Sequence, residues 1–262
     1  MKKVTAKKSL GQHFLTDKNI AEKIVNSLSD VSPSCSILEI GPGMGILTGI
    51  LIEKYGNSLY VVEIDAESVR YLSELYPSLS IIHGDFLKMD ITKHFSQPLA
   101  VIGNFPYNIS SQIFFKLLNH REQVREIVCM LQKEVAERIA SVHNCKSYGI
   151  LSVLLQAFYK VEYLFTVHEH VFSPAPKVKS GVIRLTRNPN GNLGCNEKLF
   201  FTVVKTAFNQ RRKTLRNALK NLSLPARIAN ETILNKRAEQ LSVSDFIYLT
   251  HTIENLTQQQ SY

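Results

Sequence analysis

The sequence lacks several patterns that would place it in other classes of protein. It has no run of 18 or more apolar residues, so no membrane-spanning helix is expected. No apolar segment follows the basic N-terminus, so no secretory leader is expected. No CxxC or Cys/His spacing suggests a zinc site or a disulfide framework, and we expect reduced cytoplasmic thiols and no metal. The four cysteines lie far apart, at Cys35, Cys129, Cys145 and Cys195.

Acidic residues are scarce relative to basic ones. The 262 residues include 31 Lys and Arg but only 22 Asp and Glu, a net charge of +9. From Arg187 onward there are eleven basic and five acidic residues, a net charge of +6. A protein this basic usually binds a polyanion, and nucleic acid is the leading candidate. With 44% apolar residues, the chain can build one large domain and a small one.

Apolar strands alternate with amphipathic helices over most of the chain. This alternation predicts an α/β fold with a parallel sheet covered on both faces. Two prolines keep residues 172–178 extended, and a turn-rich linker at 188–192 suggests a domain boundary near residue 190. The expected domains are therefore 1–190 and a smaller all-helical 191–262, in which 197–221 forms one helix. Strands are expected at 36–40, 59–64, 80–83, 99–103, 126–131, 161–167 and 181–186, and helices at 17–28, 46–55, 66–76, 110–119, 133–142 and 149–159.

A glycine-rich loop, Glu39-Ile-Gly-Pro-Gly-Met-Gly45, lies between the first strand and a helix. Gly41 and Gly43 let the backbone pass close beneath a ligand at the helix N-terminus. Glu63 ends the second strand, where a carboxylate can accept both ribose hydroxyls of an adenosine cofactor. Asp85 follows the third strand and can accept a hydrogen bond from an adenine amine. The spacing favours S-adenosylmethionine as the cofactor.

A dinucleotide-dependent oxidoreductase is the alternative for this loop. Its fingerprint is G-x-G-x-x-G, whereas this loop is G-x-G-x-G with an acidic residue two positions before it. The loop also has no Arg or Lys to bind a diphosphate, so the alternative fits poorly.

The segment Asn104-Phe-Pro-Tyr107 follows the fourth buried strand. The Asn104 side chain and the backbone carbonyl of Phe105 or Pro106 can accept the two hydrogens of an exocyclic nucleobase amine. The nitrogen lone pair then faces an electrophile. Tyr107 offers a flat face on which the base can stack. The alternative is an ordinary turn, because Asn and Pro are common in turns.

Several motifs resemble those of the ribosomal RNA adenine N6-dimethyltransferases over residues 4–250. The later ones point to the small-subunit branch, the kasugamycin-sensitivity methyltransferases. The resemblance implies a Rossmann-like class I S-adenosylmethionine-dependent methyltransferase with a C-terminal helical domain. The matching segments are 8–15, 39–45, 62–65, 104–110, 132–138, 172–178 and 208–214.

The resemblance also implies roles for particular residues. Many relatives carry Asn where this chain has His13, and Leu where it has Phe105. A backbone contact at position 13 would survive that change. Cofactor contacts are implied at His13, Leu15, Gly41, Glu63, Asp85 and Asn104.

The mechanism that the resemblance implies is direct in-line methyl transfer to adenine N6. Asn104 and the Pro106 carbonyl orient the amine, and Tyr107 and Phe172 sandwich a base that has left its stack. Alignment matters more than activation, so no general base is required. Phe172 has an alternative role as a core aromatic, because buried aromatic residues are common.

Basic residues near the end of the expected 197–221 helix are candidates for binding RNA phosphates. The alternative is a solvated helix face, and the charge asymmetry favours RNA. Four lysines of the N-terminal arm form a second candidate clamp. The candidates near the helix end are Arg211, Arg212, Lys213 and Arg216, and those in the arm are Lys2, Lys3, Lys7 and Lys8.

Together these features predict dimethylation of two adjacent adenosines in a 3′-terminal hairpin of small-subunit (16S) ribosomal RNA. We expect a cytoplasmic monomer whose partner is the small ribosomal subunit. Competing interpretations are a large-subunit methyltransferase of the macrolide-resistance type, a noncatalytic assembly factor and, less favoured, a DNA adenine methyltransferase. Intact Glu63, Asp85, Asn104 and Tyr107 argue against a noncatalytic role.

Overall fold

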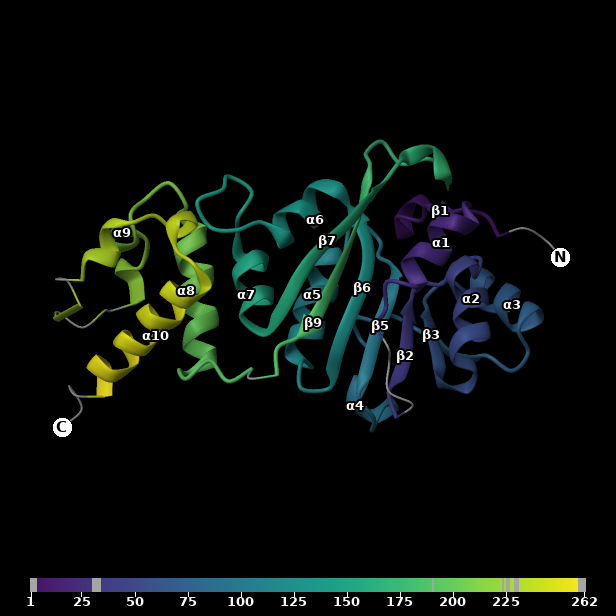
Figure 1. The fold of residues 1–262 in the computed structure, drawn as a ribbon, viewed down its shortest axis with the longest axis horizontal. Helices are drawn as coiled ribbons and strands as arrows, with labels where there is room; N and C mark the ends of the chain where they lie inside the picture. Colours follow the sequence, from purple (N-terminus) through teal and green to yellow (C-terminus); the bar gives the residue numbers. More distant parts are fainter. Residues whose placement is uncertain are drawn as a thin grey trace. The chain divides into compact units, whose positions relative to one another are not determined.

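A computed structural model describes residues 4–29, 34–189, 191–222, 224, 227–228 and 231–258 (Figure 1). The strands are β1 (Phe14–Leu15), β2 (Ser36–Ile40), β3 (Leu59–Glu63), β4 (Ser80–His83), β5 (Leu99–Asn104), β6 (Val124–Gln132), β7 (Tyr159–Val167), β8 (Phe172–Ser173) and β9 (Ser180–Arg187). The helices are α1 (Lys18–Val25), α2 (Ile46–Tyr55), α3 (Ala66–Leu75), α4 (Ile91–His94), α5 (Ser110–Asn119), α6 (Lys133–Ala140), α7 (Ile150–Phe158), α8 (Glu197–Asn209), α9 (Leu215–Ala218) and α10 (Val243–Gln258). None of these helices is both long and apolar enough to cross a membrane.

The central sheet has the strand order β4-β3-β2-β5-β6-β9-β7. The first five of these strands are parallel, as predicted. The strand expected at 181–186, for which no direction was predicted, is β9, and it runs antiparallel to β6. Ser180 at the start of β9 pairs with Gln132 at the end of β6. The chain therefore enters β9 at the carboxyl edge of the parallel strands and must run back.

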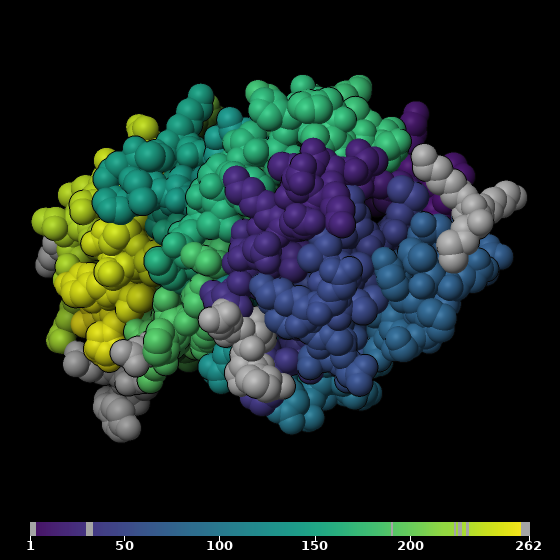
Figure 2. Space-filling model, turned by 45° about the vertical axis from the view of Figure 1, so that its right-hand side comes forward, coloured from purple at the N-terminus to yellow at the C-terminus, as the bar shows by residue number. Residues whose placement is uncertain are grey.

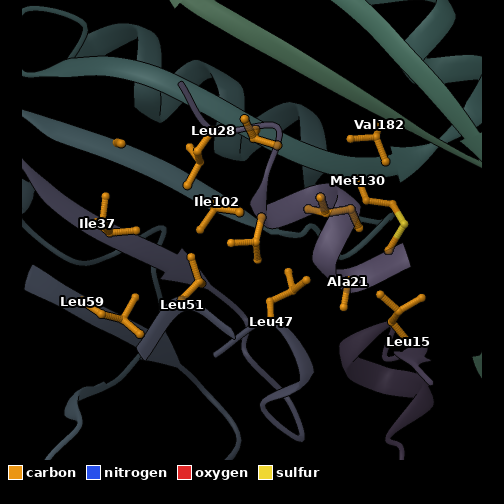
Figure 3. Close-up of a cluster of buried hydrophobic side chains, with 14 of the residues drawn as sticks. Leu15, Ala21, Leu28, Ile37, Leu47, Leu51, Leu59, Ile102, Met130 and Val182 are labelled. Atoms are coloured by element: carbon orange, nitrogen blue, oxygen red, sulfur yellow. The ribbon is translucent and has the colours of Figure 1, made fainter. Parts of the chain in front are cut away.

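A hydrophobic core lies between one face of this sheet and the first two helices (Figure 3). Leu47 and Leu51 of α2 pack with Ile37 of β2 and Ile102 of β5, and all are nearly or completely buried. Side chains on a strand alternate between the two faces, so the intervening Leu38 and Val101 face the other layer and are also fully buried. Burial on both faces explains why the parallel strands are continuous apolar runs.

The chain divides into two compact units. The first consists of 1–137 and 161–187 and contains most of the sheet, and the second consists of 138–160 and 188–262. Residues 138–160, which include α7, therefore group with the C-terminal helices and not with the rest of the domain expected at 1–190. A single boundary in the sequence cannot describe units that are each built from two separate segments of the chain.

The single helix expected at 197–221 is wrong. Helix α8 begins with an N-cap at Asn196, whose side chain accepts a hydrogen bond from the Leu199 amide, and it ends at Asn209. A turn follows, and Thr214 pairs with Arg237 in an isolated β-bridge. The next amide, that of Leu215, donates to the Lys236 carbonyl at 2.8 Å. This tertiary pairing diverts the backbone out of the helix before α9.

Candidate active site

The loops at the carboxyl ends of β2, β3, β4 and β5 surround a cavity of about 280 Å³. Parallel strands end at the same edge of a sheet, which brings together motifs that are far apart in the sequence. Nine of the predicted catalytic and cofactor-binding residues line the cavity. They are His13, Leu15, Gly41, Gly43, Glu63, Asp85, Asn104, Pro106 and Tyr107.

The glycine-rich loop forms one wall of the cavity. Gly41 has φ +68°, and a Cβ built there would meet no atom within 4 Å. Gly43 has φ +56°, and its Cβ would lie 2.8 Å from Cε1 of Phe14, so this position tolerates no side chain without rearrangement. The space beside Gly41 is lined by backbone atoms, and an adenosine-type ligand can enter it.

Glu63 is a buried carboxylate at the end of β3. Its Oε2 accepts the Gly43 amide at 3.1 Å, and its Oε1 accepts the Asp65 amide at 2.9 Å. Burial raises the pKa of Glu63, and these backbone hydrogen bonds counteract part of that rise. A carboxylate has about four acceptor sites, so capacity remains for ribose hydroxyls.

Asp85 lies in the loop after β4. Its Oδ1 accepts the Leu87 amide at 2.9 Å, which fixes the carboxylate at the cavity wall. The ammonium of Lys116 on α5 donates to the Leu87 carbonyl at 3.0 Å and to the Met89 carbonyl. Burial lowers the pKa of Lys116, while the nearby Asp85 and Asp90 oppose that effect. Sequence reasoning missed this support, because nothing local marks a lysine on α5 as a partner of that loop.

Asn104 is the last residue of β5, and only one end of its side-chain amide, the Nδ2 group, has a hydrogen-bond partner among the described residues. Its Nδ2 donates to the His13 carbonyl at 2.9 Å. Its Oδ1 is buried at the cavity and has no hydrogen-bond partner among the described residues. A buried acceptor without a donor is costly, and a ligand N–H removes that cost. The site is therefore prepared for a hydrogen-bond donor at this atom.

Tyr107 is held in place at its hydroxyl. That hydroxyl and Ser180 Oγ form a hydrogen bond of 2.6 Å. Burial raises the pKa of Tyr107, while the bond to Ser180 lowers it less, so the phenol is neutral at physiological pH. His13 stacks on the ring, and its Nδ1–H donates to the Pro174 carbonyl at 2.8 Å.

Phe172 does not line this cavity. It is 5% exposed and belongs to the hydrophobic core described above. Its backbone pairs with Leu15 in a two-stranded sheet formed by β1 and β8. In this structure Phe172 is thus a core aromatic, which is the alternative to a stacking role.

The N-terminal arm is attached to the first unit by side-chain contacts. The Lys7 ammonium forms an ion pair with Asp65, and Gln12 Nε2 donates to the same carboxylate at 3.3 Å. Burial alone would raise the pKa of Asp65, but Lys7, the Glu67 amide and Gln12 together lower it. Figure 2 shows the N-terminal part of the chain, α1 included, in purple beside a green part of the chain, and β1 in the arm pairs with β8. Lys7 is thus paired with Asp65 within the first unit, and the expected clamp residues Lys2 and Lys3 lie outside the described residues.

Glu39, the first residue of the glycine-rich loop, carries a buried carboxyl group at the cavity. It is 1% exposed, and its Oε2 accepts a hydrogen bond from Thr48 Oγ1 at 2.6 Å. Burial raises the pKa of Glu39 from 4.5 to about 8. The group is therefore largely protonated at neutral pH and supports the loop without adding a negative charge to the cavity.

The predicted RNA-binding residues lie in the second unit, at the turn after α8 and in α9. Arg211 lies 3.5 Å from the Glu239 carboxylate, and Arg216 donates to Asn235 Oδ1 at 3.1 Å. Arg212 and Lys213 are exposed. Arg216 is exposed as well, so two of the four basic groups have partners within the unit and three are exposed to solvent.

The mixed sheet, the glycine-rich loop and the acidic residues at the strand ends define a class I methyltransferase, of the kind that uses S-adenosylmethionine. Residues 3–255 match the family described as ribosomal RNA adenine dimethylase. The chain belongs to this family and is a methyltransferase.

Individual relatives agree with this placement. The chain is 58% identical over 257 residues to ribosomal RNA small subunit methyltransferase A of Flavobacterium johnsoniae, covering 97% of this chain and 98% of that protein. It is 56% identical to the protein of the same name from Cytophaga hutchinsonii, covering 97% and 99%. A dimethyladenosine transferase from Plasmodium falciparum has a similar structure, with a TM-score of 0.78 and 26% identity over 94% of this chain and 98% of that one.

Proposed function

We propose that this chain transfers methyl groups from S-adenosylmethionine to N6 of two adjacent adenosines in a 3′-terminal hairpin of 16S ribosomal RNA. The product is N6,N6-dimethyladenosine, and the reaction serves small-subunit biogenesis. The observation that carries the proposal is the buried, unpartnered Oδ1 of Asn104 at the cavity. An adenine amine is a donor that suits this atom.

The residues around the cavity fit the cofactor. Glu63 would accept the ribose hydroxyls, Asp85 would accept the adenine amine, and the backbone at Gly41 and Gly43 would pass beneath the ligand. His13, Leu15 and Asn104 complete the set. When bound, S-adenosylmethionine supplies a methyl group on a positively charged sulfur. The carboxylates of Glu63 and Asp85 also favour a cation nearby.

Asn104 and Pro106 would hold the target amine. The Asn104 Oδ1 and the Pro106 carbonyl accept its two hydrogens, which directs the nitrogen lone pair away from both acceptors. Because Asn104 Nδ2 already donates to the His13 carbonyl, its amide orientation is determined before substrate binds. Preorganised alignment of this kind lowers the barrier without requiring a general base.

Tyr107 would stack on the flipped adenine. Ser180 already anchors its ring, so the ring loses little further conformational entropy when the base stacks on it. A stacking role for Phe172 requires that its side chain leave the hydrophobic core. A second methylation requires space beside Asn104 for a monomethylated amine.

The small ribosomal subunit is the proposed partner, and the site of action is the cytoplasm, where we propose that the chain works as a monomer. Arg211, Arg212, Lys213 and Arg216 would contact phosphates. The second unit as a whole carries the excess positive charge of the sequence after Arg187. The described residues contain no group of three or more side chains suited to a metal ion.

The test is incubation with labelled S-adenosylmethionine and undermethylated small subunits, with large-subunit RNA in parallel. Digestion and nucleoside mapping should find dimethyladenosine at two adjacent small-subunit positions. Label in the large-subunit RNA would place the chain in the resistance branch. Absence of label with bound cofactor would favour the assembly-factor role.

The Asn104→Ala variant tests the proposed site within the same assay. Methylation should fall by roughly 100-fold or more because the amine loses its alignment. Cofactor binding, followed by calorimetry, should remain measurable. The matched control is Asn119→Ala at the exposed end of α5, which should retain full activity. Normal turnover by Asn104→Ala would refute the role of Asn104.

A further inference from the structure

We infer that a second RNA contact, the basic rim Lys177-Val178-Lys179, binds the strand that carries the target adenosine. Lys177 and Lys179 would bind phosphates on either side of the flipped nucleotide, and Val178 would contact the neighbouring base or ribose. The inference rests on the proposed function, and it adds a subsite in the first unit to the phosphate contacts proposed for the second unit.

The position of the rim follows from Tyr107. Ser180 anchors the hydroxyl of that ring, and Lys179 directly precedes Ser180 in the chain. The Lys133 amide donates to the Lys179 carbonyl at 2.9 Å, where β9 begins beside the end of β6. The rim thus starts one residue from the group that orients the stacking platform, and its backbone is held at that end.

The side chains of the rim are exposed. Lys177 and Lys179 are both exposed and form no ion pair with any residue that the structure describes. Val178 is 46% exposed, which makes it one of the few large apolar side chains at the surface. Two free ammonium groups that flank an apolar side chain match the alternation of phosphate and base along a nucleic-acid strand.

The neighbouring residues define which side of the rim the phosphates occupy. Gln132, Lys133, Glu134 and Glu137 line a shallow hollow together with Val178 and Lys179. Lys133 lies 3.4 Å from the Glu137 carboxylate in an exposed i,i+4 pair. Lys179 shares this hollow with two glutamates, which repel phosphate, so the strand should pass over the exposed ends of Lys177 and Lys179 and not enter the hollow.

Flipping the target base brings its flanking phosphates to the mouth of the cavity, where cations can bind them. The base leaves its stack, but it remains joined to its ribose and to two phosphates. Those phosphates must therefore lie beside the mouth of the cavity. Exposed ammonium groups on the segment that leads into Ser180 would stabilise them there, and this offsets part of the cost of removing the base from the helix.

The experiment uses the full chain with Lys177→Gln and Lys179→Gln combined. Affinity for a small-subunit RNA hairpin is measured over a series of salt concentrations, and methylation kinetics are measured on undermethylated small subunits. The slope of log affinity against log salt should become shallower by roughly 1.4–1.8, because about 0.7–0.9 is lost for each phosphate contact. The KM for subunits should rise by more than kcat falls.

The matched control is Lys18→Gln with Lys93→Gln, which removes the same charge from exposed positions elsewhere in the first unit. Equal salt slopes for the two double variants would overturn the inference. Val178→Ser should weaken RNA binding at an unchanged slope, and an unchanged affinity would remove Val178 from the subsite. If the unaltered chain methylates no subunits, the proposed function itself fails. If the unaltered chain methylates subunits but the rim variants bind RNA with an unchanged salt slope, the rim inference alone fails.

Discussion

The imidazole of His13 stacks on the phenol ring of Tyr107, with ring centroids 5.6 Å apart and the ring planes inclined by 26°. His13 also donates to the Pro174 carbonyl, and its own carbonyl accepts the Asn104 amide. This one residue therefore connects the N-terminal arm, the end of β5 and the turn after β8. A base that stacks on the same face of Tyr107 must displace the imidazole.

His13→Asn should be a mild substitution. The backbone carbonyl that receives the Asn104 amide is retained, and only the aromatic stack and the bond to Pro174 are lost. An aromatic pair contributes about 0.5–1.5 kcal/mol, so activity should change by less than about tenfold. Steady-state methylation kinetics and cofactor affinity measure the effect. A loss of several hundredfold at unchanged cofactor affinity would show that the imidazole itself acts in the reaction.

The hydrogen bond between Tyr107 and Ser180 can be tested by a double-mutant cycle. Tyr107→Phe and Ser180→Ala should each reduce the free energy of unfolding by about 0.5–1.5 kcal/mol, because each leaves one partly buried hydroxyl unpaired or absent. The double variant should lose less than the sum, since the same bond is removed only once. Urea unfolding measures all four proteins. Strict additivity would mean that the bond contributes nothing in solution.

Glu39 should make the protein less stable as the pH rises. Its pKa lies at about 8 in the native state and 4.5 without the protein environment, so between these values the native state holds a proton that the unfolded chain releases. The free energy of unfolding should therefore decline over this interval and level off above about pH 8.

Glu39→Gln should remove this contribution. In urea unfolding at several pH values, its free energy of unfolding should decline less steeply than that of the unaltered protein. Burial also raises the pKa of Glu63, so some slope should remain in both proteins. Identical slopes would show that Glu39 is ionised in the native state at neutral pH.

The basic residues after α8 should contribute unequally to RNA binding. Arg212→Gln and Lys213→Gln remove exposed charges, and each should make the salt slope shallower by roughly 0.7–0.9. Arg211→Gln should have a smaller effect, because its guanidinium already lies beside Glu239. Filter binding over a salt series measures the slopes. Equal changes in salt slope for all three variants would mean that Arg211 leaves Glu239 and binds a phosphate with no loss of binding free energy.

Local patterns in the sequence determined the strands, the glycine-rich loop and the acidic residues at the strand ends. The family assignment from these motifs is confirmed by the comparisons. The gathering of Glu63, Asp85 and Asn104 at one cavity was also predictable, since successive parallel strands end at the same edge. None of these inferences needed knowledge of contacts between distant residues.

Only the tertiary structure decided the direction of β9, the burial of Phe172, the placement of His13 on Tyr107 and the end of α8 at Asn209. His13 and Pro174 are 161 residues apart, and Lys7 and Asp65 are 58 apart. Hydrophobic periodicity and turn chemistry report only on neighbouring residues, so they cannot indicate which distant groups pair. Those pairings depend on packing and on satisfying buried polar groups, which are properties of the folded chain as a whole.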